Sequence, residues 1–189
     1  MTPFEEEVER TVEALKAGKT ILYPTDTIWG IGCDATNIKA CDKVYEAKKR
    51  PANKSLIILV DSAERLKDYV VDVPAIAYDL IKHAASPLSI IYEESKNLAK
   101  NVSSDKSVCI RVVENDFCKE VIRQLGKPIT STSANLSGQP SALTFNDITE
   151  EVKQSVDYTV QLYHDVFGKP KSSTIIKLNS DNTFEIIRR

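Results

Sequence analysis

Short apolar runs of strand length alternate with helical patterns along this sequence, and this alternation constrains the fold more than any other feature. Residues 55–60 form a continuous apolar run after their first serine, and its length and β-branched content favour a buried strand. By contrast, Phe4, Val8 and Val12 recur at the spacing of one face of a helix. Interleaved strands and helices predict an α/β protein with a mixed sheet and flanking helices.

The expected elements follow one another without a long linker, an internal repeat or a low-complexity tract. The first helix is expected between a capping box formed by Thr2 and Glu5 and a stop at Gly18. Because 189 residues are about the length of one domain, residues 1–189 are expected to form a single domain. The other helices are expected at residues 37–49, 62–69, 75–84 and 117–125, and the strands at residues 20–23, 55–60, 88–92, 108–113, 129–130, 158–162, 174–178 and 184–187.

Composition and charge narrow the class of protein. The net charge is −2, whereas a dedicated nucleic-acid binder is usually basic, so binding of RNA would need a local basic face. Only two histidines occur and the four cysteines form no C-x-x-C pair, which argues against a structural zinc site. The cysteines are instead expected to be small core residues in a reducing compartment. No apolar run reaches the ~20 residues of a membrane span and the N-terminus lacks a signal peptide, so we expect a cytoplasmic protein without membrane association.

Four cations lie within seven positions where a predicted helix ends and a buried strand begins: Lys48, Lys49, Arg50 and Lys54. Arginine and lysine donors neutralise and orient phosphate oxygens, so one interpretation of this run is a polyphosphate site. The alternative is a solvated helix end, because cations at a helix C-terminus complement the helix dipole. Local chemistry leaves both interpretations open.

Two further runs combine hydroxyl groups with turn residues. Residues 128–141 begin as a strand and continue into small polar residues, which can donate to phosphates or a carboxylate, or can form an ordinary polar loop. Residues 23–32 contain a proline, hydroxyls, an acid and two glycines, as in an exposed bend that a ligand can approach closely. An ordinary turn with a half-buried Trp29 is the alternative, and local chemistry favours it.

Arg111 interrupts the apolar run at residues 108–113, and a charge within a strand must either face solvent or find an anionic partner. An interior arginine that faces a carboxylate is the more attractive interpretation. The sequence contains neither the G-x-x-x-x-G-K-[ST] pattern of a P-loop nor a G-x-S-x-G nucleophile elbow. Neither His83 nor His164 has a catalytic context, so both are expected to be structural.

Several runs occur together in the order and spacing of one known family. They are Tyr-Pro-Thr-Asp-Thr-x-Trp-Gly from residue 23, Ala-Lys-x-Arg-Pro from residue 47, Ser-Val-x-x-Arg-Val from residue 107, Ser-Ala-Asn-Leu-Ser-Gly from residue 133 and Ser-Thr-Ile from residue 173. Each run is weakly specific by itself, but the ordered set resembles the YrdC-type L-threonylcarbamoyladenylate synthases over residues 18–188. The resemblance implies the short, single-domain form, with a twisted sheet around a large, concave, positively charged cavity.

The same resemblance implies an enzyme, a nucleotidyltransferase that condenses L-threonine, bicarbonate or CO2, and ATP. The products would be L-threonylcarbamoyladenylate and pyrophosphate, and the adenylate would serve the threonylcarbamoyl modification of adenosine 37 in tRNA. ATP would be bound as a substrate together with Mg2+, with no structural metal held by the protein. Downstream tRNA threonylcarbamoyltransferase proteins would be partners, and tRNA or double-stranded RNA would be a further ligand.

Matching the motifs residue by residue assigns a candidate site. Lys48 and Arg50 match the catalytic basic residues of the family. The threonine-binding positions of the family match Thr27, Arg111, Ser131 and Ser173. The ATP-binding positions match Arg50, Lys54, Ser107, Ser133, Asn135, Ser141 and Arg188.

The sequence departs from the family pattern at three places. Residues 85–89 replace a Pro-Gly-Pro-x-Thr stretch, Leu59 stands where some members have a histidine, and Arg188 is followed by a second arginine instead of Pro-Gly. Two other functions stay open at this level. One is an RNA-binding module without catalysis, and the other is a paralogue of the same fold with another substrate.

Overall fold

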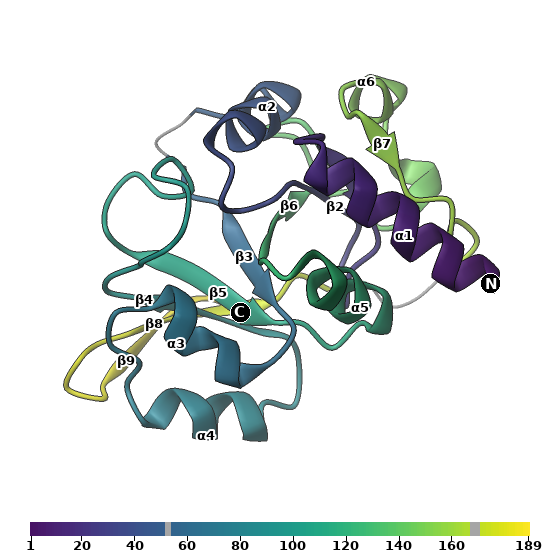
Figure 1. The fold of residues 1–189 in the computed structure, drawn as a ribbon. Coiled ribbons are helices and arrows are strands. Elements are labelled where there is room, and N and C mark those ends of the chain that lie inside the picture. The colour runs from purple at the N-terminus through teal and green to yellow at the C-terminus, as the bar shows by residue number, and fades with distance from the viewer. Residues whose placement is uncertain (52–53, 167–170) are drawn as a thin grey trace.

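Nine strands form one mixed sheet in the computed structural model, which describes residues 1–51, 54–166 and 171–189 (Figure 1). The strands of these residues are β1 (Ile21–Tyr23), β2 (Gly30–Gly32), β3 (Ile57–Val60), β4 (Leu88–Tyr92), β5 (Val108–Val112), β6 (Ile129–Ser133), β7 (Tyr158–Thr159), β8 (Thr174–Leu178) and β9 (Phe184–Arg188). They lie in the order β7-β1-β2-β6-β3-β5-β4-β8-β9, with parallel pairs such as β3 and β5 and antiparallel pairs such as β1 and β2. The predicted α/β class with a mixed sheet is confirmed.

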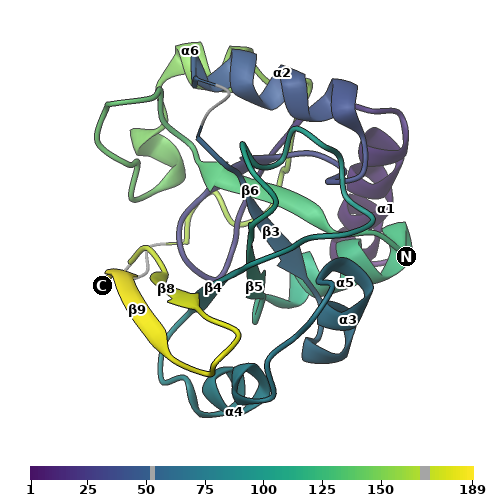
Figure 2. The ribbon, with the colours of Figure 1, turned by 90° about the vertical axis from the view of Figure 1, so that its left-hand side faces the viewer.

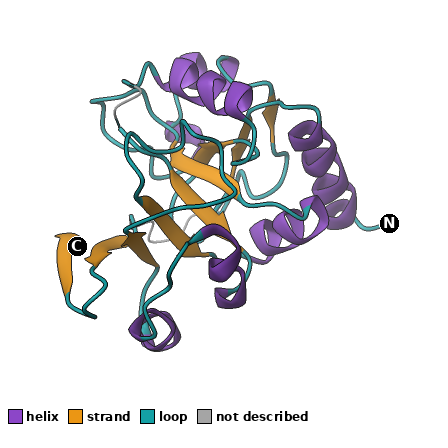
Figure 3. Cartoon of the chain, turned by 60° about the vertical axis from the view of Figure 1, so that its left-hand side comes forward, coloured by secondary structure: helices purple, strands orange, loops and turns teal. Residues whose placement is uncertain are grey.

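The described residues also form α-helices, which lie around the outside of the sheet (Figure 3). They are α1 (Pro3–Lys16), α2 (Ile38–Lys48), α3 (Leu66–Tyr69), α4 (Ile76–His83), α5 (Asp116–Leu125) and α6 (Glu150–Gln154), the last without a counterpart among the predicted helices. The predicted capping box begins α1, because the Glu5 N–H donates to Thr2 Oγ1 (3.2 Å) and the Thr2 N–H donates to the Glu5 carboxylate (2.8 Å). None of the helices in these ranges has both the length and the apolar character that crossing a bilayer requires.

The conformation at the C-terminal end of α2 determines which cations of the basic run are buried and which are exposed. Asn37 caps the start of the helix, and Lys49 ends it in the left-handed conformation, with a φ of 48°. The chain reverses there, and the Arg50 N–H donates to the carbonyl of Tyr45 (2.9 Å). This reversal leaves Lys49 exposed while Lys48, the residue before it, is buried.

Three strands differ most from the prediction, and one of them, β7, ends at Thr159 although a strand up to residue 162 was expected. Residues 30–32, interpreted as part of a bend, form β2, which pairs with β1 on one side and with β6 on the other. β6 continues to Ser133 instead of ending at Thr130, because β2 and β3 supply backbone partners to its polar residues. The close approach of β2 to β6 requires a glycine at position 32, where a Cβ atom would lie 2.0 Å from the carbonyl oxygen of Thr130.

The pairing register divides the sheet into two faces. Ile57 on β3, Cys109 on β5 and Ser131 on β6 are direct neighbours and share one face. Ile58 and Ile110 alternate with them, point to the opposite face and are fully buried. The hairpin of β8 and β9 forms one edge of the sheet (Figure 2). All four cysteines are free and buried, as expected of core residues.

Candidate active site

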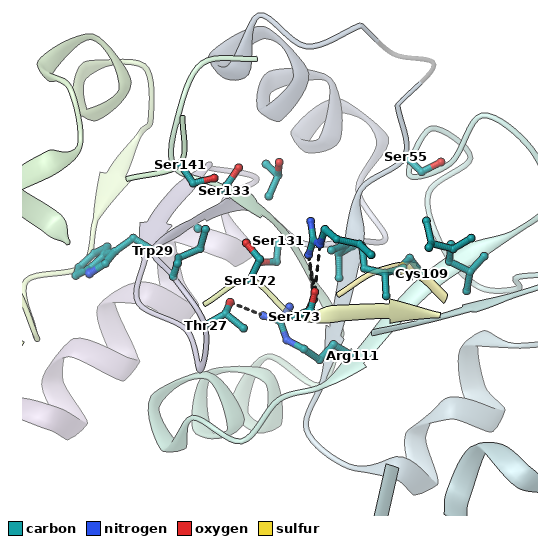
Figure 4. A pocket seen from close by; sticks show the side chains of 18 of the residues that line it. Thr27, Trp29, Ser55, Cys109, Arg111, Ser131, Ser133, Ser141, Ser172 and Ser173 are labelled. Atoms are coloured by element: carbon teal, nitrogen blue, oxygen red, sulfur yellow. Dashed lines mark hydrogen bonds between the residues drawn. The ribbon is translucent and has the colours of Figure 1, made fainter. Parts of the chain in front are cut away.

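A cavity of about 290 Å³ lies over the sheet face that carries Ser131 (Figure 4). Its walls come from the loop before β2, from β3, β5 and β6, and from the β8–β9 edge of the sheet. Most of the predicted site residues line it: Thr27, Arg50, Arg111, Ser131, Ser133, Ser141, Ser173 and Arg188. Three of them are arginines, and no acidic side chain lines the cavity in the part of the chain that the structure describes.

Arg111 lines the cavity from β5 and is only 3% exposed. Its Nη2 atom lies 3.2 Å from Oδ1 of Asp26 and 3.4 Å from Oγ1 of Thr27. Asp26 also accepts a hydrogen bond from the backbone N–H of Glu114 (3.2 Å), which ties the loop before β2 to the end of β5. The expected interior arginine with an anionic partner is therefore confirmed. Asp26 was not among the site residues predicted from the sequence. The only sequence feature that points to Asp26 is its position beside Thr27.

Arg188 on β9 holds the segment before β8 in the cavity wall. Its Nε and Nη2 atoms donate to the carbonyl oxygen of Ser173 at 3.2 and 2.9 Å, and Nη2 also donates to the Ser173 hydroxyl at 3.3 Å. The Ser173 hydroxyl lies 2.8 Å from the hydroxyl of Ser89 on β4. Both serines are buried, so these contacts form an ordered corner of the cavity.

Arg50 enters the cavity wall just after α2. Its Nε donates to the carbonyl oxygen of Lys54 (3.1 Å), and its Nη2 donates to that of Ser55 (2.8 Å). Burial lowers the pKa of the guanidinium from its usual value, but an arginine keeps its charge in proteins. Two backbone anchors therefore hold a positive charge at the cavity. Ala52 and Asn53, which belong to the same basic run, lie outside the described residues.

Lys48 does not line the cavity but lies behind it, and only 2% of it is exposed. Its ammonium donates to the carbonyl oxygens of Ser133 and Asn135, the latter at 2.6 Å. Its own carbonyl accepts from the N–H of Ser137 (2.9 Å). Burial, together with the nearby charge of Arg50, lowers the pKa of Lys48 to about 8. Lys48 thus shapes the loop that follows β6.

Three other predicted residues also lie outside the cavity lining. Lys54 is exposed and contributes its carbonyl to the anchoring of Arg50. The hydroxyl and the backbone N–H of Ser107 donate to Asp105, and the Ser107 hydroxyl is the main reason that the pKa of this carboxyl is lowered. The side-chain amide of Asn135 donates to two carbonyls of its own loop. These three residues thus make contacts within their own segments and have no place in the cavity lining.

An apolar wall completes the cavity, and none of its residues is among the predicted site residues. Trp29 in this wall is 6% exposed, more buried than expected of a turn, and packs against Phe145 at 4.8 Å and His164 at 5.5 Å between ring centroids. His164 is therefore part of a packed aromatic cluster, in keeping with a structural role. The remaining apolar lining comes from Ile28 in the loop before β2 and from the sheet with its β9 edge: Ile57, Ile91, Cys109, Ile175 and Ile187. Sheet register places Ile57, Cys109 and Ile91 side by side, because Cys109 pairs with Ile57 on β3 and with Ile91 on β4.

Three arginines, several hydroxyl groups and an apolar wall give this α/β protein a cavity whose chemistry suits an anionic ligand with an apolar part. A model of the Sua5/YciO/YrdC family, described as "Telomere recombination", matches residues 13–189. The chain belongs to this family.

Named relatives are similar over most of the chain. The threonylcarbamoyl-AMP synthase of Vibrio parahaemolyticus is 34% identical over 187 residues, which cover 96% of this chain and 97% of the relative. The crystal structure of P. abyssi Sua5 complexed with L-threonine superposes with a TM-score of 0.80 at 26% identity over 90% of this chain. This chain spans half the length of that Sua5, at 50%. E. coli YciO has the same fold, with a TM-score of 0.82 at 22% identity over 98% of this chain and 89% of its own.

Proposed function

We propose that this chain is a threonylcarbamoyl-AMP synthase, which forms L-threonylcarbamoyladenylate and pyrophosphate from L-threonine, bicarbonate or CO2, and ATP. The relatives support the proposal, because one named for this activity matches over almost its whole length and a Sua5 of the same fold has been solved with L-threonine. The observation that carries it is the convergence of Arg50, Arg111 and Arg188 on one cavity without a carboxylate in the described residues. Such a cavity suits the joining of two anionic substrates.

The two ends of the cavity are proposed to bind different substrates. The threonine end is assigned to Thr27, Arg111, Ser131 and Ser173, where a buried guanidinium and hydroxyls suit a carboxylate. The ATP side is assigned to Arg50, Ser133, Ser141 and Arg188 in the lining, together with Lys54, Ser107 and Asn135 outside it. Arg50 would contact the phosphates directly. Lys48, predicted to be a catalytic residue, would act indirectly, because its ammonium holds the loop after β6.

The proposed reaction needs no covalent bond to the protein. Threonine carboxylated on its amine, a carbamate, attacks the α-phosphorus of ATP, the bond to the β-phosphate oxygen breaks, and pyrophosphate leaves. The protein brings two anions together and stabilises the charge that develops on the phosphates. A magnesium ion would enter with ATP and offset triphosphate charge. Because no carboxylate lines the cavity in the described ranges, phosphate oxygens and water would hold that ion.

Several finer assignments belong to the same proposal. The enzyme class would be a nucleotidyltransferase, since an adenylyl group moves from ATP to the carbamate. Its product would pass to tRNA threonylcarbamoyltransferase proteins, which use it to modify tRNA, and the enzyme would work in the cytoplasm. Residues 1–189 are proposed to act as one functional unit. Direct binding of tRNA or double-stranded RNA would be confined to a local basic face, because the net charge is −2.

Purified protein incubated with ATP, Mg2+, bicarbonate and L-threonine is expected to release pyrophosphate only when threonine is present. Omitting bicarbonate, or replacing L-threonine by D-threonine, serves as the control. Release that prefers another amino acid would identify a paralogue with another substrate. Absence of release together with steeply salt-dependent RNA affinity would identify an RNA-binding module instead.

The affinity for ATP is expected to fall as the pH rises through about 8. Burial and the charge of Arg50 lower the pKa of Lys48 to about 8, so its ammonium is protonated at pH 7 and mostly neutral at pH 9. Loss of that charge weakens binding of a polyanion, and the Kd for ATP would rise about tenfold one unit above the pKa if only the protonated form binds. Titration calorimetry with ATP alone excludes any effect of bicarbonate. An unchanged Kd from pH 7 to pH 9.5 would contradict the role of Lys48.

A further inference from the structure

The hydroxyl of Ser89 lies directly behind the cavity wall. Ser89 is 0% exposed and does not line the cavity, whereas Ser173, whose hydroxyl is 2.8 Å away, does. In the sheet register Ser89 stands opposite Arg111 on one neighbouring strand and opposite Ile175 on the other. Ser89 therefore lies between the buried guanidinium and the Ser173 corner, on the face of the sheet that carries the cavity.

The numbers of protons and lone pairs show which serine of this pair donates the hydrogen bond. A hydroxyl group has one proton to donate and two lone pairs to accept with. Ser173 Oγ already accepts from Nη2 of Arg188 at 3.3 Å. Ser173 Oγ is also the sole side-chain hydrogen-bond partner of Ser89 Oγ in the ranges that the structure describes.

Two arrangements of the protons are conceivable. If Ser173 donated to Ser89, the proton of Ser89 would have no acceptor among the described residues, at a position closed to water. An unsatisfied buried donor of this kind is disfavoured. If Ser89 donates to Ser173, the proton of Ser89 has an acceptor, and the two lone pairs of Ser173 accept from Ser89 and Arg188. The proton of Ser173 then remains free to point into the cavity that Ser173 lines.

We propose that Ser89 is a positioning residue that directs the hydroxyl proton of Ser173 into the cavity, toward the carboxylate of the amino-acid substrate. Ser173 then presents only its proton to the ligand, and no lone pair that would repel an anionic oxygen. Arg111, opposite Ser89 in the register, supplies the second donor to the same carboxylate. The inference deepens the proposed function and rests on it, since it names how one wall of the threonine end is organised.

A double-mutant cycle separates this role from a purely structural one. Ser89→Ala is expected to raise KM for L-threonine about tenfold, as for weakening of one hydrogen bond to a charged group, with KM for ATP and the thermal midpoint near wild type. Ser89→Thr keeps the hydroxyl and is expected to restore the wild-type KM. In a Ser173→Ala background, Ser89→Ala is expected to change KM for L-threonine less than about twofold, because residues that act through each other are not additive.

The outcomes are distinct for the two claims. Wild-type protein without threonine-dependent pyrophosphate release overturns the proposed function and this inference with it. Active wild-type protein overturns the inference alone if Ser89→Ala keeps the wild-type KM for L-threonine, or if its effect is the same with and without the Ser173 hydroxyl. Should Ser89→Ala fail to fold, Ser89→Cys fills the position with a slightly larger side chain of the same shape that donates only weakly. An unchanged KM for L-threonine in that variant also overturns the inference.

Discussion

Arg111→Lys is expected to lower kcat/KM for L-threonine by about 10²-fold, the largest single effect at the amino-acid end of the cavity. The Arg111 guanidinium is buried, pairs with Asp26 at 3.2 Å and keeps further donors for a ligand. A lysine preserves the charge but replaces a planar fork of donors by one flexible ammonium, which cannot serve Asp26 and a substrate carboxylate with the same geometry. Initial rates of pyrophosphate release at saturating ATP and varied L-threonine measure the effect.

Lysine is the informative replacement at position 111. Arg111→Ala would leave Asp26 buried without its partner, and breaking a buried pair in this way costs about 3–5 kcal/mol of stability, so lost activity would not identify a cause. Arg123→Lys is the matched control, because Arg123 lies on α5, pairs with Glu120 at the surface and is 65% exposed. That control should keep wild-type kinetics. If Arg111→Lys also kept the wild-type KM for L-threonine, Arg111 would not bind the substrate.

At the ATP end, Arg50→Ala and Lys48→Ala are each expected to lower kcat/KM for ATP by about 10²-fold, but by different routes. Arg50 lines the cavity, so its loss removes a donor to the phosphates. The carbonyls of Lys54 and Ser55 that it leaves lie in a part-exposed segment where water can replace it, so the thermal midpoint should fall less than in Lys48→Ala. Lys48 is buried and holds the carbonyls of Ser133 and Asn135. Its truncation leaves a cavity and unsatisfied acceptors, which should also cost about 2–4 kcal/mol of stability.

Lys49→Ala is the matched control within the same basic run. Lys49 pairs with Glu151 on the surface, where the two side chains are 69% and 55% exposed, and such exposed pairs contribute about 0–1 kcal/mol. Kinetics and urea unfolding of the three variants together separate a phosphate site from a solvated helix end. If Lys49→Ala lowered kcat/KM for ATP as much as Arg50→Ala, the basic run would act by its overall charge and not through a built site.

Much of the fold could be predicted because its signals are local. The capping box of Thr2 and Glu5 defines the start of α1, and Asn37 and Lys49 bound α2 within one residue of the expected ends. Buried strands such as β3 and β5 follow from apolar, β-branched runs of strand length. The candidate site came from the ordered set of motifs, and the structure brings eight of its twelve residues to one cavity, while their roles stay predictions.

Other features could not be predicted because they depend on contacts between distant segments. Polar residues up to Ser133 form a strand only because β2 and β3 lie on either side of them. The partner of Arg111 is Asp26, 85 positions earlier in the chain, and the partner of Ser173 is Ser89, at a place where the family motif is altered. The basic run divides at the end of α2, so that Lys48 turns inward and Lys49 outward.

The basic run at residues 48–54 and the hydroxyl-rich run at residues 128–141 show which features depend on local sequence and which depend on the folded chain. The sequence by itself determined the α/β class, the ends of capped helices such as α1 and α2, and the residue types available for an anion site, because capping, periodicity and charge act over a few positions. Only the tertiary structure decided which of those residues face the cavity. Burial and partners across the sheet set that outcome: Arg50 lines the cavity, while the ammonium of Lys48, two positions earlier, holds the loop after β6 from behind.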